Sequence, residues 1–309
     1  MPKDHSKSGT YTAPPITGHL PLATQLRHII CGPETGFLME AHNALSARIA
    51  ENAGFKALWA SSLTISASMG LRDANELTWT QSLDLISGMI DAVGIPILMD
   101  ADSGYGDFNI FSRFVRKAGE RGVAGVCIED KLFPKINSFA KTEQHLASVN
   151  DFCAKIRAAK DNQIHPDFML VARTEALVVG ADLEETLVRA EAYYEAGADA
   201  ILVHSKSNTA HEILAFADKW SNKAPIVVVP TTYADTPTDT LTNAGVSTLI
   251  WANHSLRAAI RSMEDITARI FKQQSLNGID ADVTSIEDVF SLTDMSELIA
   301  ATKRYQGHS

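Results

Sequence analysis

Residues 95–130 read IPILMDADSGYGDFNIFSRFVRKAGERGVAGVCIED, and this stretch decides the fold. Two apolar runs of strand length, Ile95–Met99 and Ala124–Ile128, flank a helix-patterned segment from Phe108 to Gly122. A strand that is apolar on both faces is typical of a buried parallel sheet. The stretch therefore predicts two neighbouring parallel strands joined by a helix.

Each of the two apolar runs ends in carboxylates. Asp100 and Asp102 follow the first run, and Glu129 and Asp130 follow the second. The carboxyl ends of parallel strands meet at one edge of the sheet, where α/β enzymes place their chemistry. Any one of these acids could be a solvated loop residue or a helix cap, but several at matching strand ends favour a cation site. Oxygen ligands without His or Cys suit Mg²⁺.

The strand–helix unit recurs along the chain. Several of its helices end at a glycine, which can supply the left-handed residue that terminates a helix. Length alone allows two ordinary domains or one large barrel, but eight such units predict a (β/α)₈ TIM-type barrel. An open Rossmann sheet would carry GxGxxG after its first strand, whereas residues 41–44 read AHNA. We expect strands at Gly36–Ala41, Lys56–Ala60, Pro96–Asp100, Gly125–Glu129, Phe168–Arg173, Ala200–His204, Pro225–Pro230 and Ser247–Trp251.

The two ends of the chain differ from the repeating part. Residues 1–21 are polar and contain prolines but no periodicity, so we expect a flexible arm followed by a single barrel domain over residues 22–309. Helical patterning continues beyond the eighth strand, and a barrel needs only one helix there. The additional helices are expected either to pack on another subunit or to cap the same barrel. They are predicted at His254–Gln274, Ser285–Leu292 and Met295–Tyr305.

The composition limits the partners and the compartment. The chain has 27 Lys and Arg against 37 Asp and Glu, a net charge of −10, which disfavours nucleic acid or an anionic membrane as the main partner. A small anionic substrate stays compatible, because local cations and a metal can oppose the net charge. The three cysteines have no CxxC spacing, which indicates a reducing compartment. No apolar run approaches the ~20 residues of a membrane span, so we expect a soluble, cytoplasmic protein.

A long polar loop follows the acidic end of the fourth predicted strand. Residues 130–144 read DKLFPKINSFAKTEQ, which is too long for a simple connection between a strand and a helix. Long loops at this face of a barrel often act as lids. Lys135, Asn137 and Ser138 could reach a bound anion from this loop. The alternative is an ordinary solvated loop.

Together these stretches resemble the phosphoenolpyruvate mutase and isocitrate lyase superfamily, over Leu22 to Tyr305. The resemblance implies a Mg²⁺-dependent α/β barrel whose last helix is exchanged with a neighbouring subunit, usually in a homotetramer built as a dimer of dimers. The matching segments are MEAHNALSARIAENAGFKALWASSLTISASMGLRDANE, ILMDADSGYGDFN, GVCIEDKLFPKINS, DFMLVARTEA, AGADAILVHSK, VVVPTTY and IWANHSLRA.

The resemblance also implies roles for individual residues. Asp100 corresponds to the direct Mg²⁺ ligand, and Asp102, Glu129 and Asp73 to the acids that hold its water shell. Asp73 is either an orienting group or a transient nucleophile. The implied substrate pocket consists of Trp59, the backbone around Ser61, Ser62 and Leu63 for the carboxylate, Arg173 and His204 for the phosphoryl group, and Lys135, Asn137 and Ser138 of the gating loop. Related enzymes read WGSGLS where residues 59–64 read WASSLT, so Ser62 replaces a glycine that lets a ligand approach the backbone.

The loop sequence discriminates among the reactions of the superfamily. Its carbon–carbon lyases carry a cysteine acid in a KKCGH-type loop, whereas residues 134–138 read PKINS. Phosphonopyruvate hydrolases have a threonine where this chain has Asn137, and an amide can donate a hydrogen bond but cannot act as a base. The resemblance therefore predicts reversible conversion of phosphoenolpyruvate to 3-phosphonopyruvate. The alternatives are phosphonopyruvate hydrolysis to pyruvate and phosphate, another reaction through an enolate, or a non-catalytic barrel that serves as a scaffold.

Overall fold

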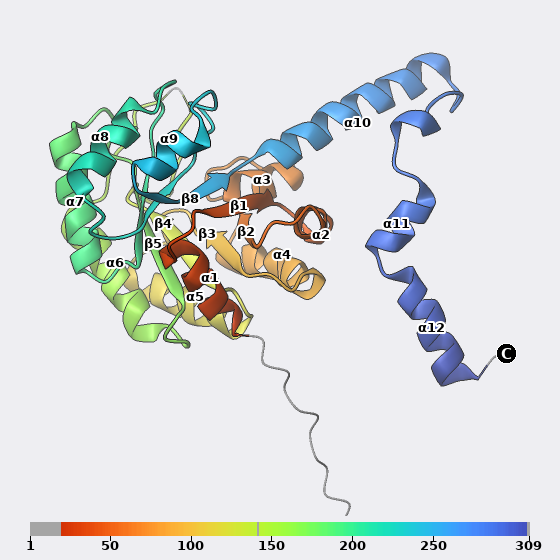
Figure 1. Ribbon diagram of the computed structural model, residues 1–309, viewed down its shortest axis with the longest axis horizontal. Helices are drawn as coiled ribbons and strands as arrows, with labels where there is room; N and C mark the ends of the chain where they lie inside the picture. The colour runs from red at the N-terminus through yellow and green to blue at the C-terminus, as the bar shows by residue number, and fades with distance from the viewer. Residues whose placement is uncertain (1–19, 141, 308–309) are drawn as a thin grey trace, which may run out of the picture.

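The computed structural model describes residues 20–140 and 142–307. Its eight strands are parallel and close into a barrel in sequence order, with helices around it (Figure 1). The predicted (β/α)₈ fold is thus confirmed, and the ends of the predicted strands differ from the observed ones by at most two residues. The strands are β1 (Gly36–Ala41), β2 (Ala57–Ala60), β3 (Ile97–Asp100), β4 (Gly125–Glu129), β5 (Met169–Thr174), β6 (Ala200–Val203), β7 (Ile226–Val228) and β8 (Val246–Trp251).

Local sequence signals set where the helices begin. The Asp107 carboxylate accepts hydrogen bonds from the backbone N–H groups of Asn109 and Ile110, and Thr78 and Gln81 form a capping box. The helices are α1 (Leu22–Cys31), α2 (Ala44–Asn52), α3 (Ser62–Ser68), α4 (Trp79–Ala92), α5 (Phe108–Glu120), α6 (Val149–Asn162), α7 (Leu183–Glu195), α8 (His211–Trp220), α9 (Thr238–Asn243), α10 (His254–Gln273), α11 (Ile286–Leu292) and α12 (Met295–Gln306), with a 3₁₀ turn at Asp280–Asp282.

The strands are apolar on both faces because each face contacts a different core. In β3, Ile97 and Met99 pack in the layer between the sheet and the helices, whereas Leu98 joins the cluster inside the barrel. This alternation follows from the two-residue period of a strand. It determines which residues at the strand ends point into the barrel mouth.

Helix α1 closes the amino-terminal end of the barrel. Leu26 and Ile30 are fully buried and belong to the interior cluster. A Cβ atom on Gly125 would lie 2.6 Å from Met169 Cβ and 3.0 Å from Leu26 Cδ2, so a glycine at this point of β4 leaves room for both the neighbouring strand β5 and the helix. The opposite, carboxyl end of the barrel is therefore the one left for a site. A cleft of about 650 Å³ lies beside α1, at the starts of β1 and β2. It is larger than the cavity at the carboxyl end of the barrel.

The C-terminal helices lie apart from the barrel core. Helix α10 projects outward, and α11 and α12 follow it at a distance from the strands (Figure 1). None of the residues of α11 and α12 is buried, and Phe271, Ile286 and Leu298 leave 79%, 63% and 57% of their surface exposed. Helix α11 contacts α2, where Arg48 donates to the Leu292 carbonyl at 2.7 Å.

Two further expectations concern the chain ends and membranes. Apart from residues 20 and 21, the predicted N-terminal arm lies outside the described residues. Within the described ranges, no helix combines the length and the apolar character that a membrane crossing requires.

Candidate active site

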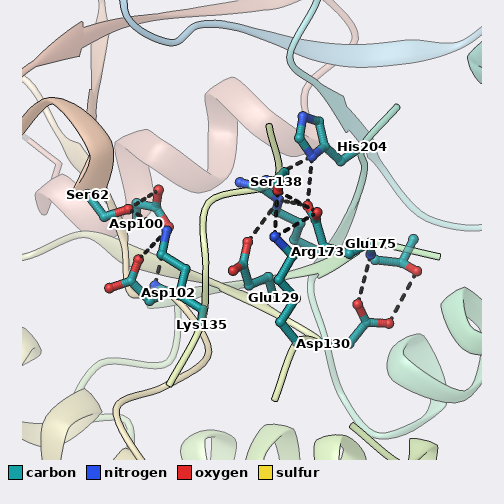
Figure 2. A network of polar contacts seen from close by, with 12 residues as sticks. Ser62, Asp100, Asp102, Glu129, Asp130, Lys135, Ser138, Arg173, Glu175 and His204 are labelled. Carbon is teal, nitrogen blue, oxygen red and sulfur yellow. Dashed lines mark hydrogen bonds and ion pairs between the residues drawn. The ribbon is translucent and has the colours of Figure 1, made fainter. Parts of the chain in front are cut away.

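The inward-facing positions of four neighbouring strands converge at the carboxyl end of the barrel. Asp100 lies two residues after the inward-facing Leu98, and parallel pairing sets Glu129 beside Arg173. The strand period thus places charged side chains directly above the apolar interior. The side chains that continue the inward faces are Asp100 of β3, Glu129 of β4, Arg173 of β5 and His204 after β6, as Figure 2 shows.

The gating loop, residues 132–140, brings Lys135 into the acidic part of this mouth. Its Nζ atom is 2.9 Å from Asp73 Oδ1 and 2.7 Å from Asp102 Oδ1, and its side chain is 5% exposed. Ser62 Oγ accepts from Lys135 Nζ at 3.2 Å and donates to Asp100 Oδ2 at 2.9 Å. Burial alone would lower the pKa of Lys135, but the surrounding carboxylates hold it well above its usual value. The lysine therefore stays protonated and offsets part of the negative charge.

The nearby cations only partly offset the cost of burying the charged form of these acids. Burial raises the pKa of Asp102 to about 6, and Lys135 offsets this only in part. Burial likewise raises the pKa of Glu129 to about 7 against the opposing effect of Arg173. Glu129 Oε1 is buried and has no hydrogen-bond partner. The mouth is thus an oxygen-rich site that an additional cation would stabilise.

The donor set fits a hydrated divalent cation. Within residues 20–140 and 142–307, no three His, Cys, Asp or Glu side chains converge as a ready-made ligand cage. Mg²⁺ commonly binds through one or two carboxylates and keeps several of its water molecules. Asp100, with a free surface toward the cavity, and the unpartnered oxygen of Glu129 fit that mode of binding.

The gating loop is folded over the mouth. Asn137 Nδ2 donates to Asp73 Oδ2 at 2.5 Å, and Asn75 accepts from the Lys135 backbone N–H at 2.6 Å while donating to Asp102 at 2.8 Å. Burial would raise the pKa of Asp73, but Lys135 and the Asn137 amide lower it overall. Asp73 is therefore ionised, and its carboxylate binds Asn137 and Lys135 of the loop.

A small cavity of about 50 Å³ lies beneath the closed loop. This volume accommodates only a few water molecules, so a larger ligand must enter while the loop is displaced. The remaining two predicted site residues, Asp102 and Glu129, lie behind this cavity and contact Lys135 and Arg173. The predicted residues that line the cavity are Trp59, Ser61, Ser62, Leu63, Asp73, Asp100, Lys135, Asn137, Ser138, Arg173 and His204.

The serine that replaces a glycine in the related motif is accommodated without strain. Ser62 is not among the described residues with a positive φ, so its backbone does not require glycine. Its hydroxyl points to Asp100 and Lys135. The side chain thus joins the acidic cluster at the mouth.

Glu175 is a central polar residue that the sequence analysis did not include among the site residues. It is fully buried, and its Oε1 atom contacts Arg173 Nε and His204 Nδ1 at 2.5 and 2.7 Å (Figure 2). Burial opposes ionisation, but Arg173 and His204 hold the pKa of Glu175 well below its usual value. Burial and Arg173 also lower the pKa of His204 despite Glu175, so the imidazole is neutral at pH 7. The position of Glu175 two residues after Arg173, at a strand end, is the sequence signal that could have identified it.

Other contributors also lie outside the predicted set. Asn75 holds the loop from a distant segment of the chain, whereas Lys131 donates to the Ile136 carbonyl only five residues further along. The cavity is completed by Phe139, Val229, Thr231, Ala252 and Asn253.

Comparisons with known proteins agree with this architecture. The family model described as phosphoenolpyruvate phosphomutase matches residues 26–271. A phosphoenolpyruvate phosphomutase of Tetrahymena pyriformis is 49% identical over 283 residues, which cover 91% of this chain and 94% of that protein.

Solved structures with the same fold include two kinds of enzyme. A phosphoenolpyruvate phosphomutase from Streptomyces platensis subsp. rosaceus superposes with a TM-score of 0.90 at 46% identity, covering 92% of this chain and 99% of that one. A phosphonopyruvate hydrolase in complex with oxalate and Mg²⁺ gives 0.87 at 35% identity, covering 93% and 100%. The chain therefore belongs to the phosphoenolpyruvate phosphomutase family.

Proposed function

We propose that this protein is an isomerase that interconverts phosphoenolpyruvate and 3-phosphonopyruvate, and so makes or breaks a carbon–phosphorus bond. The main supporting observation is the cavity beneath the closed loop. Arg173 and His204 line it from the barrel, and the loop contributes the neutral amide of Asn137. Such a cavity can hold a transferring phosphoryl group while it excludes water. The greater likeness to phosphomutases than to the hydrolase supports the same reaction.

The cation that we propose for the site is Mg²⁺. Asp100, which lines the cavity, would bind it directly. Asp73 in the lining, and Asp102 and Glu129 behind the cavity, would hold its water molecules. When bound, the ion would stabilise the negative charge of an enolate as a Lewis acid. The hydrolase structure that contains Mg²⁺ is compatible with this choice.

The protein groups divide the substrate between two ends of the cavity. We assign the carboxylate to the backbone N–H groups around Ser61, Ser62 and Leu63, beside the wall formed by Trp59. The C2–O–P bond breaks at the other end, and the same phosphoryl group rejoins at C3 of the enolate. There the phosphoryl oxygens would accept hydrogen bonds from Arg173, His204, Asn137 and Ser138.

Lys135 and Asp73 close the site. In the closed loop, Lys135 pairs with Asp73, and Asp73 accepts from Asn137. These contacts support an orienting role for Asp73, because its oxygens are already engaged by the loop. The loop must open to admit the substrate and close before the phosphoryl group moves.

We further propose that the chain works in the cytoplasm as a homotetramer, a dimer of dimers with exchanged C-terminal helices. Exposed apolar side chains on α10, α11 and α12 would be covered by a neighbouring subunit. All three cysteines are free, which fits a reducing compartment.

Phosphorus-31 NMR of the protein with phosphonopyruvate and Mg²⁺ tests the reaction. The phosphonate signal should be replaced by that of a phosphate ester. Inorganic phosphate as the main product would assign hydrolysis instead. No change in the spectrum would leave the barrel without this activity.

A further inference from the structure

A buried ion pair lies directly beneath the gating loop, outside the cavity. Lys131 and Glu175 are 3% and 0% exposed, and Lys131 Nζ is 3.4 Å from Glu175 Oε2. Neither residue lines the cavity. A buried charged pair needs further hydrogen bonds to be tolerated, so the partners of these two side chains indicate what the pair is for.

Lys131 finds its partners in the loop above it. Its Nζ atom donates to the Ile136 carbonyl at 3.0 Å and to Ser138 Oγ at 2.7 Å. At the base of the same loop, Lys131 pairs in an antiparallel bridge with Leu146. Lys131 therefore connects the base of the loop to the segment that covers the cavity.

Glu175 continues this connection to the phosphoryl end of the cavity. Ser138 Oγ donates to Glu175 Oε2 at 2.7 Å, and the other carboxylate oxygen contacts Arg173 and His204. Both contacts of the His204 ring within this cluster fall on Nδ1, so Nε2 is the nitrogen left for a ligand. A continuous polar path thus runs from the loop to the two side chains that would hold the phosphoryl group.

Opening the loop would break this path at a cost. Lys131 would lose the Ile136 carbonyl and the Ser138 hydroxyl and keep only the longer contact with Glu175. Unsatisfied buried charged groups are strongly unfavourable. The pair therefore favours the closed loop, and Glu175 connects the closed loop to Arg173.

We propose that Lys131 and Glu175 are positioning residues that couple closure of the loop to the placement of Arg173 and His204. The coupling keeps water from the phosphoryl group until the loop is closed and the two side chains are set. This inference rests on the proposed function, because its consequence for the products needs a phosphoryl group that moves within the cavity.

Two variants of the full-length protein test the inference, Lys131→Met and Glu175→Gln. We expect amide hydrogen exchange of residues 132–140 to become about 10- to 100-fold faster, the effect of losing a hydrogen bond to a charged group. With phosphonopyruvate and Mg²⁺, the ratio of inorganic phosphate to phosphoenolpyruvate should rise at least about tenfold, because the loop opens while the phosphoryl group is exposed. Lys131→Arg keeps the cation and should restore most of both properties.

Matched variants separate this role from general stability. Lys160→Met removes a lysine that pairs with Asp199 on the barrel wall, so neither the exchange of the loop nor the product ratio should change. Ser138→Ala removes the loop hydroxyl that contacts both Lys131 and Glu175 but replaces neither charged residue, and its loop should also exchange faster. It replaces the buried-charge variants if these do not fold.

The outcomes are distinct. Loop exchange and product ratio equal to those of the parent in the folded variants would overturn the proposed coupling. A parent protein that itself releases mainly inorganic phosphate would overturn the proposed function. In that case the amide hydrogen exchange of residues 132–140 would still test the coupling. Equal exchange in the variants and the parent would refute it.

Discussion

Lys135 Nζ lies 2.7 Å from Asp102 Oδ1, so the gating loop delivers a positive charge into the acidic mouth of the barrel. This contact joins two parts of the site that the sequence separates by more than thirty positions. It also makes the position of the loop dependent on the charge of the mouth, because the same carboxylates would hold a metal ion. Binding of the proposed cation would therefore be linked to loop closure through one cluster of oxygens.

The first prediction concerns the proposed metal. Asp100→Ala should abolish Mg²⁺-dependent turnover and leave the fold intact, since it removes the carboxylate expected to bind the ion directly. Activity with graded Mg²⁺ and the thermal unfolding temperature are the measurements. Asp84→Ala is the matched control, because Asp84 is 70% exposed and pairs with Arg121 away from the mouth. Full activity of Asp100→Ala in the presence of a chelator would refute the assignment.

Part of this site follows from the sequence for a physical reason. Apolar runs identify buried parallel strands, and the two-residue period of β3 carries the inward face from Leu98 to Asp100. Related motifs then point to the roles of Asp100, Arg173 and His204. Strand periodicity therefore predicts both the barrel and the charged residues at its mouth.

The remainder depends on contacts between distant segments. Lys131 and Glu175 are 44 residues apart, and only the closed loop brings them under Ser138. The conformation of a loop does not follow from a repeating pattern of apolar residues. The sequence predicts that Lys135 faces an anion, whereas in the structure it pairs with Asp73 and Asp102. The arrangement of α11 and α12 does not follow from the sequence either, because a helical period does not say which surface covers their exposed apolar side chains.

The second prediction concerns assembly. A chain that ends before Thr284 lacks α11 and α12, and we expect it to form smaller oligomers and to unfold at a lower temperature. The exposed apolar side chains of these helices are the physical reason, since removing apolar surface from water is favourable by about 25 cal/mol per Å² before the costs of association. Light scattering coupled to size-exclusion chromatography measures the oligomer. A truncated protein with the parent's oligomeric state and activity would contradict the proposed exchange.

The third prediction concerns pH and stability. Glu40 is fully buried, with Oε1 2.7 Å from His42 Nδ1, and it accepts hydrogen bonds from Ser255 and the Leu256 backbone that tie β1 to α10. Burial would raise its pKa, but these partners lower it overall. A lowered pKa adds stability above the unfolded value of about 4.3, and this stability is lost as the pH falls through the folded value.

Glu40→Gln should accordingly reduce the free energy of unfolding at pH 7 by about 1–3 kcal/mol, the cost of weakening a buried charged hydrogen-bond network. The difference from the parent should shrink as the pH falls below about 4.3. Urea unfolding between pH 3 and pH 7 measures this difference. A deficit that stays constant over the whole range would show that the ionisation of Glu40 does not contribute.

The last prediction tests the residue on which the choice of reaction depends. Asn137 lies in the closed loop above Arg173 and His204, and its amide can donate to a phosphoryl oxygen but cannot activate water. Losing one positioned donor to developing charge typically lowers kcat by about 10²–10³. Asn137→Ala should therefore reduce conversion of phosphonopyruvate to phosphoenolpyruvate by that factor, with a smaller effect on Mg²⁺ binding.

Two companion variants complete this test. Gln144→Ala removes the hydrogen bond that Gln144 donates to the Asn137 carbonyl at 2.9 Å, so it loosens the loop but keeps the amide. Its kcat should fall less than that of Asn137→Ala. Asn137→Thr introduces the hydroxyl that the family resemblance implies for phosphonopyruvate hydrolases, and we expect water to compete and release some inorganic phosphate. Equal activity of Asn137→Ala and the parent would remove Asn137 from the mechanism, because a donor that stabilises the moving phosphoryl group cannot be lost without slowing its transfer.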